Sequence, residues 1–131
     1  MGTFEMIDIL KNEGIYNEFW AFKRTTKSFG VFIENLDNPE DYEPWFTVKK
    51  SEFDSDEDAV IGPLKGTVSL DEDITYDFEL DENDLDIDVR DYYFDVKLIR
   101  TSPKFLAIPV WGKFSVFPDI TNKTELDIQE D

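Results

Sequence analysis

The sequence predicts an all-β sandwich built as a single domain. Residues 91–100 alternate between apolar and polar positions, several other short apolar segments are separated by turn signals, and no long amphipathic helix pattern is present. A chain of 131 residues is long enough to bury a core without metal or disulfide bonds. Twelve Phe, five Tyr and three Trp supply bulky side chains for that core.

Residues 91–100 give the clearest strand signal, and we expect them to form a central strand. Side chains of a strand point alternately to its two faces. The expected inner face carries Tyr92, Phe94, Val96 and Leu98. The expected outer face carries Tyr93, Asp95, Lys97 and Ile99. No Gly or Pro interrupts this stretch, as is typical of a strand interior.

The other expected strands follow from the same reasoning. They cover residues 19–25, 29–34, 45–50, 59–61, 64–70, 74–80 and 105–117. We expect Gly62 and Pro63 to break the chain between two short strands, and the last strand to bend near Pro109 and Gly112. Residues 81–85 are expected to form one helical turn. This spacing favours an immunoglobulin-like sandwich of about seven to eight strands, with a small β-barrel as the alternative.

The domain organisation expected from composition has three parts. Residues 1–18 form an N-terminal arm, residues 19–120 the β-sandwich domain, and residues 121–131 an acidic tail that we expect to be disordered. Apolar side chains of the arm, including Phe4, Met6 and Ile7, need a partner surface.

Composition excludes several kinds of chemistry. The chain contains no Cys and no His, which excludes disulfides, thiol nucleophiles, Cys/His zinc sites and histidine acid–base catalysis. Thirteen Lys and Arg against thirty-one Asp and Glu give a formal net charge of −18. That charge argues against direct binding of nucleic acid or of anionic membranes. It allows basic protein partners, divalent cations and, less commonly, imitation of DNA, and the simplest interpretation is that it keeps the protein soluble.

The ends and the hydropathy give an expectation for location. The first residues lack the basic start and apolar centre of a signal peptide, and no run of eighteen apolar residues occurs. We therefore expect synthesis in the cytoplasm and no membrane span.

Acidic clusters are weak candidates for metal binding or catalysis. Asp54, Asp56 and Asp58 have the opening spacing of an EF-hand loop, but Ala59 and Lys65 stand where that loop needs Gly and Glu. The series at 84, 86 and 88 fails in the same way. With thirty-one acidic residues, a close carboxylate pair is expected by chance and does not indicate a glycosidase. We expect no enzyme activity, no metal and no cofactor.

Two surface functions remain open from residue patterns. Trp20, Trp45 and Trp111 are candidates for a sugar-binding face, although aromatic residues on regular strands are more often core. The expected outer face of residues 74–80 carries Thr75, Asp77 and Glu79. Together with flanking acids at 71, 73, 81 and 84 these residues form an acidic stripe. Carboxylates spaced over a surface in this way can imitate the phosphates of DNA.

Four segments, in order, resemble the N-terminal domain of phage upper-baseplate proteins, which support receptor-binding proteins. They are residues 46–51 with the following acidic loop and residues 58–61; residues 74–85; the Tyr-Tyr-Phe-Asp-Val-Lys-Leu strand at 92–98; and the Gly-Lys-Phe-Ser-Val-Phe-Pro-Asp-Ile-Thr segment at 112–121. The resemblance covers about residues 45–121, and more loosely the hairpin from Phe19.

The resemblance implies an immunoglobulin-like module that docks in a phage tail tip or baseplate. The expected partners are tail and baseplate proteins, with a homo-oligomer within the particle as a further expectation, and the expected final location is the virion tail after synthesis in the host cytoplasm. An acidic DNA-mimic inhibitor is the first alternative function and a carbohydrate-binding module is the second. The expected interface residues are Phe4, Met6, Ile7, Tyr93 and Trp111.

Overall fold

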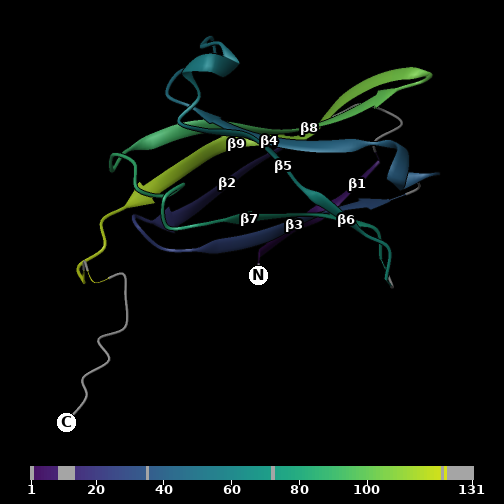
Figure 1. Cartoon of the computed structure of the whole chain (residues 1–131). Helices are drawn as coiled ribbons and strands as arrows, with labels where there is room; N and C mark the ends of the chain where they lie inside the picture. The colour runs from purple at the N-terminus through teal and green to yellow at the C-terminus, as the bar shows by residue number, and fades with distance from the viewer. Residues whose placement is uncertain (1, 9–13, 35, 72, 122, 124–131) are drawn as a thin grey trace.

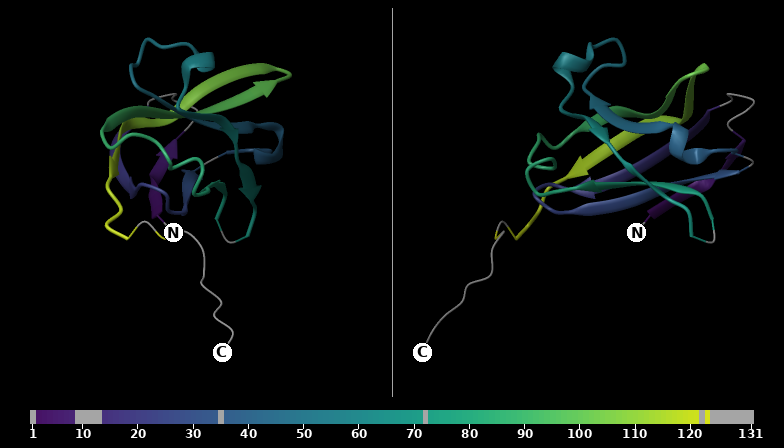
Figure 2. Two further views of the ribbon diagram at one scale, coloured as in Figure 1. Left: turned by 60° about the vertical axis from the view of Figure 1, so that its left-hand side comes forward. Right: turned by 45° about the vertical axis from the view of Figure 1, so that its right-hand side comes forward.

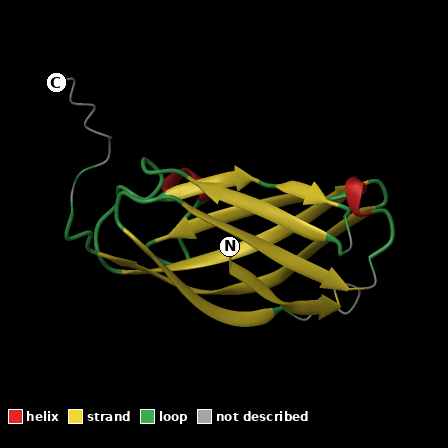
Figure 3. Cartoon of the chain, turned by 90° about the horizontal axis from the view of Figure 1, so that it is seen from below, coloured by secondary structure: helices red, strands yellow, loops and turns green. Residues whose placement is uncertain are grey.

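The fold is a sandwich of two β-sheets (Figures 1 and 2). The computed structural model describes residues 2–8, 14–34, 36–71, 73–121 and 123, and for residues 2–8 and Glu34 it describes the backbone alone. The strands are β1 (Gly2–Asp8), β2 (Ile15–Phe22), β3 (Lys27–Glu34), β4 (Glu43–Lys49), β5 (Ile61–Lys65), β6 (Thr67–Ser69), β7 (Thr75–Leu80), β8 (Asp91–Thr101) and β9 (Lys104–Phe117). Two short 3₁₀ helices, η2 (Pro39–Asp41) and η3 (Asp56–Asp58), lie in loops (Figure 3).

The strand order confirms the predicted immunoglobulin-like sandwich. One sheet has the order β1-β3-β7-β6 and the other has the order β2-β9-β8-β4-β5. In immunoglobulin domains the second, fifth and fourth strands adjoin in one sheet, and the third, sixth and seventh in the other. With β2 taken as the first strand, β3-β7-β6 and β4-β8-β9 reproduce both groups. β5, beside β4, takes the place of the first of the two strands that variable-type domains add. β2 pairs with β9 in parallel, at the edge of the five-stranded sheet.

Strands β2 to β9 correspond to the eight expected from the sequence, with different bounds at several places. β2 begins at Ile15, inside the expected arm, and β1 pairs in parallel with β3. The expected break at Gly62 and Pro63 is wrong, because β5 runs through both. β5 lies at a sheet edge, where a missing N–H leaves no ladder partner unsatisfied. The expected disorder of the tail concerns residues that, apart from 121 and 123, lie outside the described part of the chain.

The chain changes sheets at Gly66, between β5 and β6. The Gly66 N–H donates to the Pro44 carbonyl over 2.9 Å. A Cβ atom at this position would lie 2.6 Å from the Asp77 carbonyl oxygen and 2.7 Å from the Phe78 ring. Only glycine therefore permits this close crossing, and the single strand expected over residues 64–70 is divided between the two sheets.

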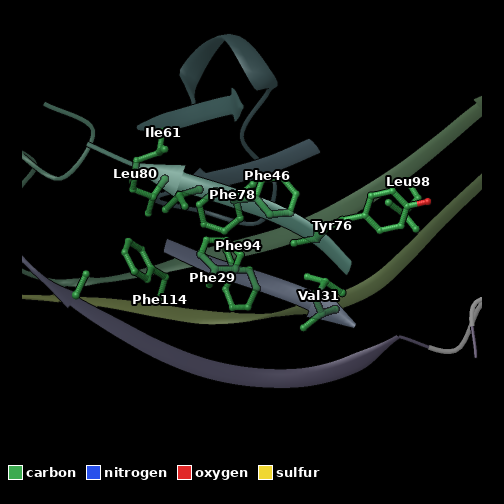
Figure 4. Packing of buried hydrophobic residues seen from close by; sticks show 14 of the residues in the cluster. Phe29, Val31, Phe46, Ile61, Tyr76, Phe78, Leu80, Phe94, Leu98 and Phe114 are labelled. Carbon is green, nitrogen blue, oxygen red and sulfur yellow. The ribbon is translucent and has the colours of Figure 1, made fainter. Parts of the chain in front are cut away.

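A phenylalanine cluster fills the space between the sheets (Figure 4). Phe29 of β3 and Phe46 of β4 have ring centroids 4.9 Å apart, and Phe46 and Phe94 of β8 are 5.9 Å apart. Phe19 of β2 adds an edge-to-face contact with Phe94 at 4.7 Å. Immunoglobulin domains of antibodies hold their sheets with a disulfide beside a buried Trp. In this cysteine-free chain, aromatic packing performs that task.

The inner faces of β7 and β8 confirm the predicted alternation. The four expected inner residues of β8 are 4% exposed or less, and Tyr76, Phe78 and Leu80 of β7 are 2% exposed or less. The expected turn at residues 81–85 is present, with Leu85 N–H bonded to the Asp81 carbonyl over 3.2 Å. Leu85 is fully buried, so this turn closes one end of the core.

Tyr92 closes the connection between β7 and β8 with a single hydrogen bond. Its hydroxyl donates to the Asp88 carbonyl over 2.6 Å. This is the arrangement of the tyrosine corner, in which a Tyr near the start of the sixth strand bonds a backbone carbonyl a few residues upstream. Burial raises the pKa of the Tyr92 hydroxyl, so the group remains a donor over the physiological range.

We expect Tyr92→Phe to lower the free energy of unfolding by about 1 kcal/mol, because it removes this hydrogen bond and leaves the packing intact. Urea denaturation measures the change. Tyr93→Phe is the matched control, since Tyr93 points outward, and it is expected to change stability by less than about 0.5 kcal/mol. Equal effects of the two substitutions would contradict a structural role for the Tyr92 hydroxyl.

Candidate functional site

All three tryptophans lie outside the core, on the outer face of the five-stranded sheet. Trp20 on β2 is 50% exposed and Trp111 on β9 is 43% exposed. Trp45 precedes the buried Phe46 on β4, so it faces outward and is half-buried. The general preference of strand aromatics for the core therefore does not apply to these three residues. The inward positions next to Trp20 and Trp45 are held by Phe19 with Ala21 and by Phe46.

Further aromatic side chains extend this surface, which we call the aromatic face. Its members, besides Trp45, are 43–51% exposed: Tyr16, Trp20, Phe22, Tyr93, Trp111 and Phe117. Tyr16 contacts Trp111 edge to face, with ring centroids 4.9 Å apart, and Trp20 contacts Phe22 at 5.3 Å. The face thus holds two ring clusters, Tyr16 with Trp111 and Trp20 with Phe22 and Phe117, and the Glu18–Lys113 pair lies between them. Single exposed aromatics are ordinary, whereas clusters of them mark an interaction site.

A β-bulge on β9 directs Trp111 outward. Val96 pairs with Val110 and Leu98 pairs with Ala107, so β9 carries one residue more than β8 across this interval. Before the bulge the exposed residues of β9 are even-numbered, Leu106 and Ile108, and after it they are odd-numbered. Bulges redirect side chains in this way. The bend predicted near Pro109 is confirmed.

The aromatic face contains a groove with a volume of about 1120 Å³. Its walls are the loop of residues 50–58, which carries η3, and the β8–β9 hairpin; both rise above the five-stranded sheet in Figure 1. The residues of its floor come from three adjacent strands: Trp45, Thr47, Tyr93, Asp95, Lys97 and Trp111. Tyr93 and Trp111, both predicted as interface residues, line this groove.

The acidic wall loop is folded by its own carboxylates. Lys49 Nζ lies 2.9 Å from Asp56 Oδ1 and donates to the Asp54 carbonyl over 2.9 Å. The Ser51 N–H donates to Asp54 Oδ2 over 3.2 Å, and Ser55 Oγ donates to Asp58 Oδ2 over 3.2 Å. The three acids with EF-hand spacing thus serve separate contacts. The described part of the chain contains no cluster of three acids suited to a metal ion.

Asp95 lies in the middle of the groove floor. It pairs in register with Trp111 of β9 on one side and with Thr47 of β4 on the other. Burial raises the pKa of its carboxyl, Lys49 and Lys97 oppose that change, and Asp56 adds to it. Among the residues that the structure describes, the Asp95 carboxylate has no hydrogen-bond or ion-pair partner. The site therefore keeps a partly desolvated carboxylate without a partner of its own.

Because its pKa is higher in the folded than in the unfolded chain, ionised Asp95 lowers stability at neutral pH. This penalty disappears as the pH falls through the folded-state pKa, where the carboxyl takes up a proton. We expect Asp95→Asn to raise the free energy of unfolding at neutral pH, with a smaller gain near about pH 4. Urea denaturation at both pH values measures this.

Glu79→Gln controls for the removal of one negative charge, because Glu79 is exposed on the other sheet. Its gain at neutral pH is expected to be smaller than that of Asp95→Asn. Equal gains for both variants would show that relief of net charge, and not the groove, explains the effect.

The predicted interface residues divide between the two sheets. Tyr93 and Trp111 belong to the five-stranded sheet, whereas Phe4, Met6 and Ile7 belong to β1 at the edge of the four-stranded sheet. The side chains of these three lie outside the described residues. Sequence reasoning missed Asp95 and Tyr16 as members of the site, and it named Trp45 only as a candidate for a sugar-binding face. The outward position of Asp95 in the alternation of β8 was the available signal.

The acidic stripe lies on the four-stranded sheet. Asp77 and Glu79 alternate with buried residues of β7 and so face outward. Asp81 and Asp84 are engaged in the following turn, where each carboxylate accepts the backbone N–H of the other residue, over 2.8 and 2.9 Å. The stripe and the aromatic face therefore occupy opposite sides of the sandwich, and variants can separate their roles.

Comparison with known proteins gives no family assignment. No protein-family model matches the chain, and a search of curated proteins found no match. Within the described residues, no helix has both the length and the apolar character needed to cross a membrane.

Proposed function

We propose that the chain is a non-enzymatic assembly domain that docks onto another protein through the aromatic face. The observation that carries this proposal is the outward position of all three tryptophans, beside Tyr16, Phe22, Tyr93 and Phe117. Protein interfaces are enriched in Trp and Tyr, and a few such residues supply most of the binding energy.

The partner proposed is a protein of a phage or prophage tail tip or baseplate. The resemblance over residues 45–121 supports this choice, and so does the immunoglobulin-like topology that the resemblance implies. The domain would then be made in the host cytoplasm and act in the virion tail, in one or several copies per particle. Its negative charge would speed encounter and orient it toward basic surfaces of the neighbouring tail proteins.

We expect Trp111→Ala to weaken binding to purified tail-tip or baseplate proteins at least about 30-fold, because a central aromatic contributes about 2 kcal/mol or more at an interface. Light scattering of the mixtures gives the mass of the assemblies, and titration gives the affinity. Circular dichroism and thermal unfolding verify that the variant is folded.

Leu70→Ala is the matched control, because Leu70 is 51% exposed and lies between β6 and β7 of the other sheet. It is expected to bind as the unchanged protein does. If Trp111→Ala binds normally while the double change Asp77→Asn and Glu79→Gln abolishes binding, the acidic stripe is the functional surface.

A carbohydrate-binding module is the second candidate function, favoured by the groove itself. Trp45, Tyr93 and Trp111 line the groove together with the polar Thr47 and Asp95, and small-molecule sites combine aromatic lining with a few polar groups in this way. Titration with soluble cell-wall polysaccharide, followed by tryptophan fluorescence, tests this candidate. A saturable change would support it, and an unchanged spectrum would rule it out.

A further inference from the structure

We propose that the groove of the aromatic face binds an arginine side chain presented by a short segment of the partner protein, with Asp95 as its counter-ion. This inference rests on the proposed docking function and names the chemistry that the partner must supply.

The first support is the unpaired carboxylate. Asp95 lies on the groove floor, opposite Trp111 and Thr47, and its carboxylate makes no hydrogen bond or ion pair with any described residue. A partly buried charge is costly unless it is paired. A cationic side chain of a partner would pair with this carboxylate. The desolvation free energy that the free protein does not offset would then be offset in the complex.

The second support is the aromatic surroundings of this carboxylate. Trp45, Tyr93 and Trp111 line the same groove. A guanidinium group is planar, stacks on aromatic rings and donates two parallel hydrogen bonds to a carboxylate. Trp111 is the direct cross-strand neighbour of Asp95, so one arginine can reach both. Lysine offers a point charge without the planar stacking surface, and we expect it to bind less tightly.

The third support is the distribution of charge. The lysines facing Asp95 are Lys49, which is held by Asp56 over 2.9 Å, and Lys97. With Glu52 and Asp56 on the wall, the groove lining contains three acids, counting Asp95, and two lysines, so its formal net charge is −1. The whole chain carries −18 and attracts cations at long range. A second copy of this chain is disfavoured as the occupant, because two such charges repel.

The test uses a blocked pentapeptide, acetyl-Gly-Val-Arg-Val-Gly-amide, added to the full ¹⁵N-labelled chain. Indole N–H signals report on each tryptophan, and Trp20 is the internal control because it lies on β2 outside the groove. We expect saturable shifts for Trp45 and Trp111 and none for Trp20. Affinity should fall at least about tenfold for the isosteric citrulline peptide and for Asp95→Asn, as expected for a charged hydrogen bond. Glu79→Gln should bind as the unchanged protein does.

Equal binding of the arginine and citrulline peptides would overturn the proposal, and so would equal shifts of all three indoles. Shifts of Trp45 and Trp111 with a cell-wall oligosaccharide but not with the arginine peptide would identify a sugar site instead. Loss of assembly in Trp111→Ala without peptide binding would leave the docking function standing and reject the arginine contact. Peptide binding without any assembly with tail proteins would support the arginine contact and reject docking onto tail proteins.

Discussion

The packing of phenylalanine rings between the sheets is the interaction on which the rest of this structure depends. With no cysteine in the chain, the two sheets are held by apolar contacts and not by a disulfide. Phe29, Phe46 and Phe94 come from three strands and meet at ring distances of 4.9 and 5.9 Å. Burial of such rings supplies both apolar area and directional ring contacts. The hydroxyl of Tyr92 and the turn around Leu85 then close one end of this core.

This core has a consequence for the outer surface. Successive side chains of a strand point to opposite faces, so the residues next to an inward Phe point outward. Phe19 faces inward and its neighbour Trp20 outward, and Phe46 faces inward and its neighbour Trp45 outward. Trp111 lies three residues before the inward Phe114, an odd number of positions, and so also faces outward. The aromatic face is therefore built into the same pattern that builds the core. The η3 loop and the β8–β9 hairpin add the walls that turn part of this face into a groove.

Much of the fold could be predicted from the sequence, and much of the site could not. The alternation in residues 74–80 and 91–100 is local information, and it correctly predicts which residues face inward. The break at Gly62 was a wrong prediction, because the effect of Pro63 depends on β5 being an edge strand, and that depends on the whole sheet. The environment of Asp95 depends on the register that places it opposite Trp111, which includes a bulge. Residues this far apart in sequence are brought together only by the complete strand order.

Since no described core position holds a tryptophan, tryptophan signals report on the outer face of the five-stranded sheet. The most direct test of the account is therefore fluorine NMR of the chain labelled with 5-fluorotryptophan, recorded with and without unlabelled tail-tip or baseplate proteins. If the aromatic face docks, the resonances of Trp45 and Trp111 shift or broaden when the assembly forms. An assembly of the expected mass in which no tryptophan resonance changes would contradict docking through the aromatic face.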